Sequence, residues 1–490
     1  MNKRIAEIFT ALGCQPSSQA RGLPVHCPAD GNIIAHLPQD TSATLESKIQ
    51  QAQGAQRIFC RLKREARAAL LEHYAAALRE KRELLAEIIT LDGGKTPKEA
   101  LGEVNGSADI LIKTIKDATL PEFNGMLRCK ERPPVGVIGL ITSFNFPMVV
   151  AHWTIAPAWL AGNAVLWKPS EKTPLVALAC KAIFDKAAGA EADLLHVLIG
   201  GRDIGQQLVA HERVDMISAT GSVAMGQSIK KALASKKNNR VRPILELGGN
   251  NGVIISDKMS FEHLEWSVKA LLNSFFGTTG QRCTNTRRLF VQRHRYEKTV
   301  ELLEGHIRAL TKDKWDEYGY GPLIDADAYR LFEQGKKRAA EEGGEIRFGK
   351  RLFEKERPQT FFVEPALALI PVHTAVMGDE VFAPLLFVAP YDDLNQAIAF
   401  VNTPANAGLV NGIYTQSQAE ADRFAAENEA GHSVINSAKG TGTSAFGMGF
   451  GGNKASGTGE ILNAADPLRP FTRDEHYHRI AQNKDIAMDR

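Results

Sequence analysis

The chain has 490 residues, and its 59 Lys and Arg residues nearly balance its 56 Asp and Glu residues, for a net charge of +3. This length exceeds one ordinary hydrophobic core, so we expect several domains. The charge balance argues against a broad nucleic-acid-binding surface. A content of 44% hydrophobic and 23% charged residues is typical of a globular protein and excludes a disordered or fibrous one.

The cysteines show neither the density nor the CxxC spacing of a disulfide framework or a zinc site. They stand at positions 14, 27, 60, 129, 180 and 283. We expect reduced thiols and a cytoplasmic protein, because the amino terminus also lacks a signal-peptide pattern. Residues 146–167 carry no charge, but Pro157, Gly162 and Asn163 punctuate the stretch as a helix, a turn and a buried strand. No membrane span is expected.

Residues 40–117 place apolar residues three and four apart, which predicts packing helices. The Pro-Pro break within 118–137 then indicates a hairpin or a connecting strand. From there strands and helices alternate. Strands are predicted at 135–142, 163–169, 194–200 and 214–220, and helices at 148–161, 174–189, 203–211 and 223–236.

This alternation predicts a parallel, doubly wound sheet that binds ligands beyond the carboxyl ends of its strands. After residues 245–255 a second alternating unit runs to about residue 445. It contains predicted helices at 263–277 and 325–341 and strands at 287–292 and 366–372. We therefore expect two α/β domains of the doubly wound, Rossmann-like class.

The common nucleotide-binding motifs are incomplete. No strand-to-helix turn of the first unit carries G-x-G-x-x-G, and in ATGSVAMGQS Gln227 stands where a P-loop requires Lys. Gly221 and Ser222 still open a helix, where free N–H groups favour a phosphate, although Ser222 is equally explained as a simple N-cap. His476 and His478 have no acidic or cysteine partners nearby, so we expect no metal.

Cys283 follows a glycine-rich turn and has Arg282, Arg287 and Arg288 around it, cations that favour a thiolate if they point inward. A lone cysteine is otherwise a small buried hydrophobe. Glu246 ends an apolar strand, as a structural ion-pair partner or a general base with a raised pKa would. Asn145, after the first predicted strand, is suited either to stabilise an oxyanion or to brace a turn.

Together, SFNFP, WKPSEKTP, ATGSVAMG, LELGGNN, GQRCT, DEVFAP and GFGGNKASG occur in an order that closely resembles the aldehyde dehydrogenase superfamily. The resemblance runs from about residue 40 to at least residue 460. FNFP, ERVD, LELGGNN and GQRCTNTRRLFV most resemble the antiquitin-type α-aminoadipic semialdehyde dehydrogenases.

The resemblance implies NAD-dependent oxidation of an aldehyde to a carboxylic acid. Cys283 would attack the aldehyde carbon, and Asn145 with the Cys283 backbone N–H would hold the oxyanion. Glu246 would activate the water that hydrolyses the resulting thioester.

The resemblance also implies a cofactor site, in which the Glu171 carboxylate binds ribose hydroxyls and repels an added phosphate, so that NAD is favoured over NADP. Glu171 departs from the antiquitin type, which has a small residue there. The implied cofactor residues are Ile141, Thr142, Ser143, Phe144, Lys168, Glu171, Gly221, Ser222, Glu380 and Phe382.

Glu103 and Arg282 match positions that in antiquitin-type enzymes recognise the amino and carboxylate groups of the substrate, a pairing suited to a zwitterion. The alternative is a solvated helix residue and a structural loop residue. The substrate implied is α-aminoadipic semialdehyde, of lysine catabolism, with another semialdehyde or an aliphatic aldehyde as the alternative. A catalytically silent NAD-binding structural protein is the alternative of a different class.

The expected organisation is an NAD-binding domain, a catalytic domain and a small β oligomerisation element, which by resemblance would form a dimer or a tetramer. The NAD-binding domain takes residues 1–117 and 138–247, with 448–464 returning to it. The catalytic domain takes 248–447, and the oligomerisation element takes 118–137 and 465–490.

Overall fold

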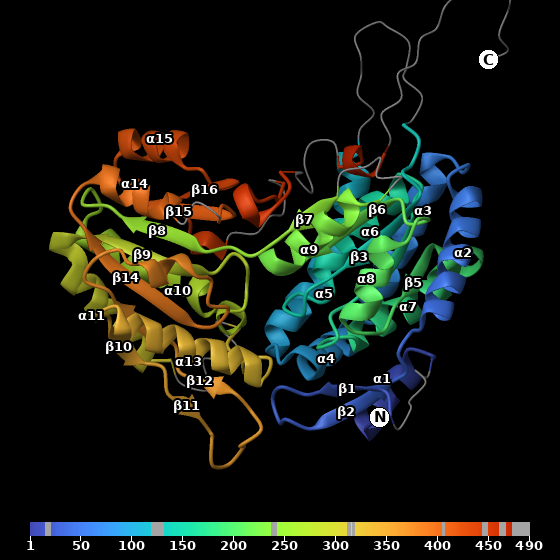
Figure 1. Cartoon of the computed structure of the whole chain (residues 1–490), viewed down its shortest axis with the longest axis horizontal. Coiled ribbons are helices and arrows are strands. Elements are labelled where there is room, and N and C mark those ends of the chain that lie inside the picture. Colours follow the sequence, from blue (N-terminus) through green and yellow to red (C-terminus); the bar gives the residue numbers. More distant parts are fainter. Residues whose placement is uncertain are drawn as a thin grey trace, which may run out of the picture.

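The computed structural model describes residues 1–14, 21–118, 132–236, 243–310, 315, 319–403, 407–442, 449–459 and 467–472. These residues form two lobes, each built around one large β-sheet (Figure 1). One sheet has five strands in the order β5-β4-β3-β6-β7, and the other has seven in the order β10-β13-β14-β9-β8-β15-β16. The prediction of an α/β fold with two doubly wound units is confirmed.

The first sheet is parallel throughout. Its strands are β3 (Val137–Ile141), β4 (Ala164–Lys168), β5 (Leu195–Val197), β6 (Met216–Thr220) and β7 (Ile244–Glu246). The chain runs from central β3 outward to β4 and β5, then crosses to β6 and β7 on the other side. The loops after β3 and β6 therefore leave in opposite directions, which opens a crevice at the carboxyl ends of these two strands.

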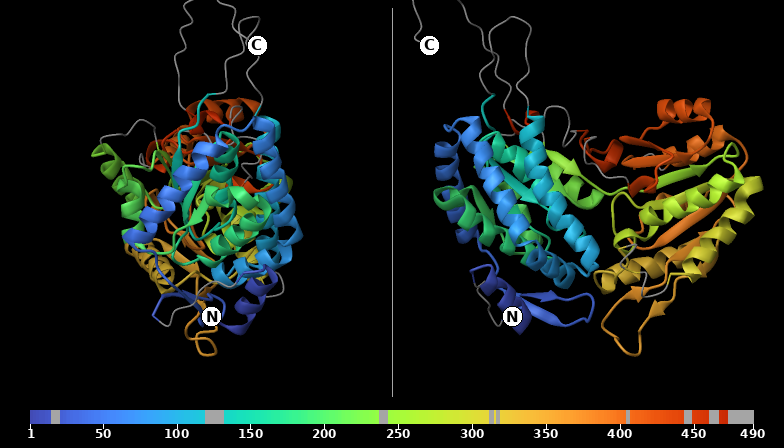
Figure 2. Two further views of the ribbon diagram at one scale, coloured as in Figure 1. Left: turned by 90° about the vertical axis from the view of Figure 1, so that its right-hand side faces the viewer. Right: turned by 180° about the vertical axis from the view of Figure 1, so that it is seen from behind.

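Helices cover both faces of this sheet. They are α1 (Lys3–Ala11), α2 (Ser42–Phe59), α3 (Arg64–Glu80), α4 (Arg82–Gly93), α5 (Pro97–Asp117), α6 (Val149–Leu160), α7 (Leu175–Ala188), α8 (Arg202–Ala210) and α9 (Val223–Ala234). α6 and α7 pack on one face beneath α3, α4 and α5, and α2 and α8 pack on the other (Figure 2). The packing helices predicted within 40–117 are confirmed as α2 to α5, and Lys81 separates α3 from α4.

α6 accounts for the uncharged stretch at 146–167. Every residue of this helix except Trp153 is buried, between β3 and β4 on one side and α5 on the other. A helix buried all round reads as a hydrophobic run without spanning a bilayer. Among the residues that the structure describes, no helix is long and apolar enough to cross a membrane.

A hairpin of β1 (Leu23–His26) and β2 (Ile33–Leu37) precedes α2 and was not predicted. Its strands have only four and five residues, and the turn between them contains Gly31 at φ +76°. Strands this short carry little periodicity.

The second sheet is parallel except for its edge strand β10. Its strands are β8 (Asn251–Ile255), β9 (Thr286–Gln292), β10 (Glu345–Phe348), β13 (Ala366–Leu369), β14 (Leu385–Tyr391), β15 (Val410–Tyr414) and β16 (His432–Ile435). Two hydrophobic clusters lie on its opposite faces. One involves α10 (Phe261–Phe276) and α11 (Tyr296–Arg308), and the other α13 (Ala326–Glu341), α14 (Leu394–Asn402) and α15 (Gln418–Glu427). β11 (Arg351–Leu352) and β12 (Phe362–Val363) form a separate small pair.

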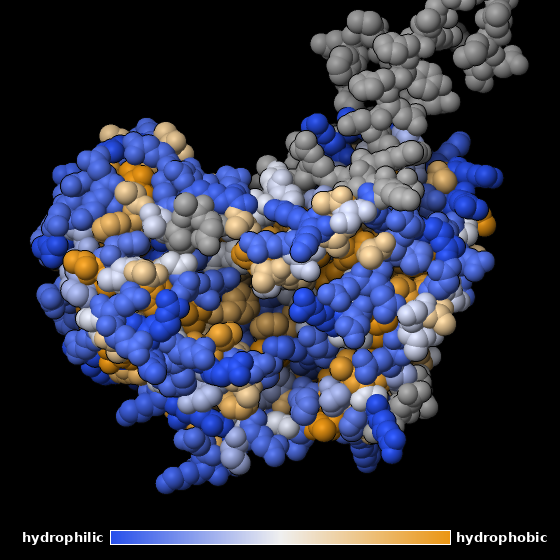
Figure 3. Space-filling model, in the orientation of Figure 1, coloured by the Kyte–Doolittle hydropathy of each residue, from blue (hydrophilic) through white to orange (hydrophobic). Residues whose placement is uncertain are grey.

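Residues 247–250 connect the last strand of the first sheet to the first strand of the second. The later segment 449–459 returns to this junction, where Leu247 N–H donates to the Ser456 carbonyl at 2.8 Å and Glu246 pairs with Gly457. Figure 3 shows a hollow between the two lobes, with hydrophobic residues in its depth. The carboxyl end of the first sheet is therefore joined to the amino ends of β8 and β9 in the second sheet.

The expected oligomerisation element falls largely on 119–131 and 473–490, which lie outside the described residues. Its described parts meet, because Pro134 pairs antiparallel with Thr472 and Val135 N–H donates to the Phe471 carbonyl at 3.2 Å. The oligomerisation role stays a prediction.

Candidate functional site

A strained turn precedes Cys283. Between α10 and β9, Thr278 and Thr279 have φ of 50° and 54°, in the left-handed region that β-branched residues rarely adopt. Gly280, at φ 71°, lies so close to the Ala383 backbone that a Cβ would approach its carbonyl carbon to 2.3 Å. Such strain persists only where neighbouring contacts determine the conformation, as is common at active sites.

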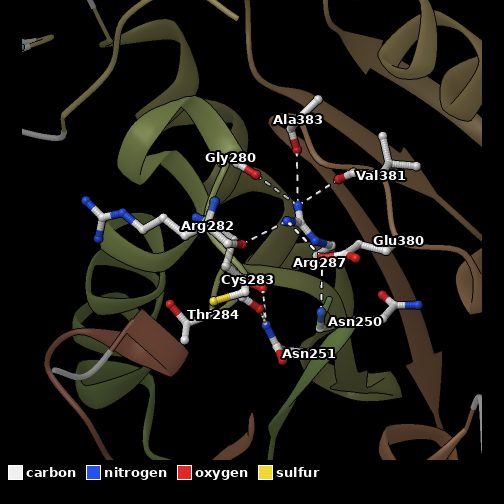
Figure 4. Close-up of polar contacts among 12 residues, drawn as sticks. Asn250, Asn251, Gly280, Arg282, Cys283, Thr284, Arg287, Glu380, Val381 and Ala383 are labelled. Carbon is white, nitrogen blue, oxygen red and sulfur yellow. Dashed lines mark hydrogen bonds and ion pairs between the residues drawn. The ribbon is translucent and has the colours of Figure 1, made fainter. Parts of the chain in front are cut away.

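Two asparagines hold the Cys283 backbone from below. Asn251 at the start of β8 donates from Nδ2 to the carbonyls of Cys283 and Asn285, both at 2.7 Å (Figure 4). Asn285 in turn accepts the Arg282 N–H at 2.5 Å. Gly249 closes the contact, since a Cβ there would lie 2.4 Å from the Cys283 carbonyl oxygen. The loop position is thus tied to the junction between the lobes.

The thiol lies in a largely apolar setting, packed against the cluster of Leu409, Val410 and Phe450. Burial raises the pKa of the Cys283 thiol to about 12, with smaller contributions from the carboxylates of Glu380 and Glu246, while Arg287 opposes them. At neutral pH the thiol therefore keeps its proton until a base removes it.

Glu246 is a buried carboxyl that the protein leaves partly unpartnered. Its residue is 4% exposed at the end of β7, and among the described residues nothing donates to Oε2. Burial raises its pKa well above the usual value. A buried carboxyl with a raised pKa, whose charge acts on the Cys283 thiol, has the chemistry of a general base.

Asn145 lies in the turn after β3 and is 6% exposed. Its Oδ1 accepts the Ser143 hydroxyl at 2.7 Å, which fixes the orientation of the amide. No described residue accepts a hydrogen bond from the Asn145 NH₂ group. The orientation of the amide is therefore fixed, and its NH₂ group is available to donate hydrogen bonds to a bound molecule.

The three arginines near Cys283 differ in direction. Arg287 donates to the carbonyls of Gly280, Val381 and Arg282 at 3.0, 2.7 and 2.9 Å, and thereby joins the nucleophile loop to residues 380–383 (Figure 4). Arg288 does not point toward Cys283. Its guanidinium donates to the Asn250 carbonyl before β8 and, at the carboxyl end of α14, to the carbonyls of Phe400, Val401 and Thr403. Adjacent residues of a strand face opposite sides.

Residues 380–383 form one wall of the site. Glu380 accepts the Gly249 N–H at 3.1 Å and lies 3.7 Å from Arg287 Nη2. Burial raises its pKa, which that cation and that N–H oppose. The Phe382 ring meets the Phe144 ring of the other lobe edge-on at 6.0 Å. Predicted cofactor residues of the two lobes are thus neighbours across the hollow.

The crevice of the first sheet gathers the other predicted cofactor residues. Ile141 ends β3 and Thr142 follows it, and the Thr142 hydroxyl accepts Trp167 Nε1–H at 2.9 Å. Lys168 at the end of β4 lies 3.5 Å from the half-exposed carboxylate of Glu171, and burial lowers its pKa. Such a cation beside a carboxylate fits a ribose with its hydroxyl groups.

Ser222 caps α9 by accepting the Met225 N–H at 3.2 Å, and the Gly221 N–H already donates to the Glu246 carbonyl. The amides of Val223 and Ala224 have no acceptor among the described residues. A helix N-terminus with free amides at the crevice rim fits a phosphate group. The residues present therefore suit a dinucleotide.

The two residues predicted to hold the substrate head group already have protein partners. Glu103 has a 1% exposed side chain that accepts Lys95 Nζ at 2.6 Å and the amides of Met148 and Val149 at 2.8 and 3.0 Å. Arg282 donates to Glu99 Oε1 at 2.5 Å. The zwitterion-binding pair stays a prediction that these contacts do not support.

Sequence reasoning did not identify Lys95, Glu99 or Asn251 as parts of the site. Glu99 and Arg282 are 183 positions apart, so no local spacing signals their contact. For Asn251, the quoted motif LELGGNN contained the residue without indicating which of its asparagines reaches the nucleophile loop. Within the described part of the chain no cluster of His, Cys, Asp and Glu could hold a metal, and His476 and His478 lie outside that part.

Comparisons with known proteins identify the family of the chain. Residues 15–475 match the aldehyde dehydrogenase family. The chain is 31% identical to the α-aminoadipic semialdehyde dehydrogenase of Bos taurus over 469 residues, which cover 92% of this chain and 84% of that one.

Among solved structures, an indole-3-acetaldehyde dehydrogenase complexed with NAD⁺ is 25% identical with a TM-score of 0.83, over 95% of each chain. An E. coli NADP-dependent enzyme is 26% identical with a TM-score of 0.84, over 94% of this chain and 95% of that one. By its sequence, its fold and the arrangement around Cys283, the chain belongs to the aldehyde dehydrogenase family and is an oxidoreductase.

Proposed function

We propose that this protein oxidises an aldehyde to a carboxylic acid with NAD, through a covalent intermediate on Cys283. The observation that carries the proposal is the buried Glu246 carboxyl, whose Oε2 accepts no hydrogen bond from a described residue and whose charge acts on the thiol that burial keeps protonated. Cys283 must lose its thiol proton before it can act as a nucleophile, and the Glu246 carboxylate, with its raised pKa, accepts a proton readily.

In the proposed reaction Glu246 takes the thiol proton and Cys283 Sγ bonds to the aldehyde carbon. The Asn145 NH₂ group and the Cys283 N–H hold the oxyanion that forms. When bound, the nicotinamide cofactor supplies the hydride acceptor. Loss of hydride to that acceptor leaves a thioester on Cys283. Glu246 releases the thiol proton to solvent and then removes a proton from the water that attacks the thioester. The carboxylic acid departs and the thiol is restored.

NAD is proposed over NADP because of Glu171. Its carboxylate lies 3.5 Å from Lys168 Nζ at the carboxyl end of β4. A 2′-phosphate in this position would meet a like charge, whereas a 2′-hydroxyl would donate a hydrogen bond to it. The remaining cofactor contacts proposed are those of Ser222 with the pyrophosphate and of Glu380 and Phe382 with the nicotinamide ribose and ring.

The first substrate candidate is α-aminoadipic semialdehyde, with a role in lysine catabolism, because a 31% identical relative is named for it. An uncharged aliphatic aldehyde is the second candidate, and the setting of the thiol favours it. Leu409, Val410 and Phe450 pack near Cys283, and the Trp153 ring lies 5.2 Å from the Phe450 ring. Arg282 and Glu103 are both already paired.

Assembly into a homodimer or homotetramer through 118–137 and 465–490 is proposed on the pairing of Pro134 with Thr472. The proposed domain boundaries are those stated from the sequence, and they place the catalytic thiol in the second lobe. Light scattering that gives a monomer at micromolar concentration would contradict the assembly.

The test measures NADH formation with α-aminoadipic semialdehyde, succinic semialdehyde and simple aliphatic aldehydes, with NAD and with NADP. The wild type should turn over at least one aldehyde, faster with NAD, and Cys283→Ser should bind NAD without forming NADH. NADH formation by Cys283→Ser would contradict the thiol mechanism. NAD binding by the wild type without turnover of any aldehyde would favour a catalytically silent binding protein.

A further inference from the structure

The first turn of α5 lies against the strained turn that carries the nucleophile. Glu99 Oε1 accepts hydrogen bonds from the Thr278 hydroxyl and from Arg282 Nη2, the latter at 2.5 Å. Arg282 Nε also donates to the Thr278 hydroxyl at 2.8 Å. One carboxylate oxygen therefore joins the beginning and the end of the strained segment.

The position of Glu99 is fixed by the N-terminal cap of α5 and by the burial of its side chain. Thr96 caps α5 by accepting the Glu99 N–H at 3.4 Å, and Pro97 occupies the first helical position. The Glu99 side chain is 9% exposed. Its other oxygen, Oε2, has no described partner and lies beside Gly319, where a Cβ would approach it to 2.9 Å. Few other positions are open to this carboxylate.

The next turn of the same helix holds the oxyanion loop. Glu103 caps α6 through the amides of Met148 and Val149, which directly follow the segment containing Asn145. Residues four apart on a helix share one face, so Glu99 and Glu103 present two carboxylates side by side. One contacts the loop of the thiol, and the other contacts the loop of the amide donor.

Phe146 connects the two loops directly. The Arg282 guanidinium lies 5.6 Å from the Phe146 ring centroid, and Lys95 Nζ lies 3.6 Å from it. Arg282 is thus held by Glu99 while it contacts the residue that follows Asn145. In Figure 4 its side chain points away from Arg287, on the other side of Cys283.

We infer that Glu99 is a positioning residue for the reaction at Cys283, acting through Thr278 and Arg282 to set the thiol relative to the Asn145 amide. This inference rests on the proposed function. It also gives Arg282 a role other than binding a substrate carboxylate. The carboxylate fixes geometry and takes no part in proton transfer, because Arg282 and the Thr278 hydroxyl occupy the oxygen that faces the loop.

The test compares Glu99→Gln, Thr278→Val and their double variant with Glu87→Gln. Glu87 is a matched control, because it also pairs with an arginine, Arg4 at 2.5 Å, but on the surface of α4. Three quantities are measured: kcat and KM for an aldehyde that the wild type oxidises, the rate of Cys283 alkylation by iodoacetamide read by peptide mass spectrometry, and the NAD dissociation constant.

Glu99→Gln should lower kcat by about 10-fold to 100-fold, the loss expected of a misplaced reacting group, with KM changed less than about threefold. Alkylation of Cys283 needs no oxyanion donor, so it should stay within about threefold of the wild type. Thr278→Val should lose part of kcat, and the double variant should lose little more than Glu99→Gln, because the two residues act through one contact. NAD affinity should be unchanged.

The inference is overturned if kcat of Glu99→Gln stays within about twofold of the wild type, if KM rises instead, or if the two losses multiply as independent effects do. A parallel fall of kcat and alkylation would indicate general damage to the loop and would also overturn it. If Glu99→Gln does not fold, Thr278→Val carries the same comparison. If the wild type oxidises no aldehyde, the proposed function itself is contradicted. If the wild type and Glu99→Gln are equally active, only the positioning role of Glu99 is contradicted.

Discussion

Two buried glutamates near the site have almost the same exposure and opposite surroundings. Glu103 on α5 and Glu246 at the end of β7 are 5% and 4% exposed. Glu103 accepts one ammonium and two backbone amides. Glu246 has an oxygen that accepts no hydrogen bond from a described residue, and burial raises its pKa well above the usual value.

The difference shows that the hydrogen-bond partners of a buried carboxylate, and not its burial, distinguish a structural role from a catalytic one. A buried charge is costly unless it is paired and hydrogen-bonded, and Glu103 meets both conditions. Glu246 meets neither, so its proton is held more tightly and is available for exchange with a neighbour. The fold leaves this carboxyl incompletely hydrogen-bonded at the place where the proposed chemistry needs a base.

The largest expected effect is that of Glu246→Gln on turnover. An amide cannot accept a proton, so kcat should fall by about 10²-fold to 10⁴-fold, the usual contribution of a general base. If thioester hydrolysis is the step most affected, a first burst of NADH should remain. Steady-state and stopped-flow absorbance measure both quantities. Glu246→Asp keeps a carboxylate and is the control. An unchanged kcat in Glu246→Gln would contradict the catalytic role that distinguishes Glu246 from Glu103.

Glu103→Gln should instead affect the free energy of unfolding. It leaves the buried Lys95 ammonium without its carboxylate, and breaking a buried pair costs about 3–5 kcal/mol. Urea denaturation measures this loss. Lys95→Met combined with Glu103→Gln should recover part of it, because no unpaired charge then remains. A loss under about 1 kcal/mol for the single variant would show that the pair is not structural in the sense proposed.

Much of the fold could be predicted because strand and helix periods are local properties of the sequence. The strand ending at Ile141 and the helix beginning at Val223 are found within a few residues of their expected limits. Cys283, Glu246 and Asn145 could be selected because each stands in a motif at the end of a predicted element. The structure brings these elements together at the junction of the lobes.

The partners of charged residues could not be predicted. Arg282 was assigned a substrate contact or a structural place in its loop, and neither assignment indicated Glu99, the carboxylate that the packing of the two lobes brings to it. Glu103 was assigned a solvated position or a substrate contact, whereas the approach of α6 gives it two amides 45 and 46 residues away. Adjacent Arg287 and Arg288 diverge because a strand alternates its faces.

The smallest expected effect is a pH dependence of stability that belongs to Glu246 alone. Its pKa in the folded protein is raised above the usual 4.5, so the folded state holds this proton more tightly than the unfolded chain does. The resulting stabilisation is fully present below pH 4.5 and is lost as the pH rises through the folded pKa.

The variant Glu246→Gln lacks this pH dependence, because its amide does not titrate. The wild type should therefore lose unfolding free energy relative to Glu246→Gln as the pH rises above about 5, measured by urea denaturation at matched salt. Asp92, whose pKa burial also raises, contributes equally to both proteins and cancels. A difference that does not vary with pH would mean that the Glu246 carboxyl is as well satisfied in the folded protein as in water, and the contrast with Glu103 would fail.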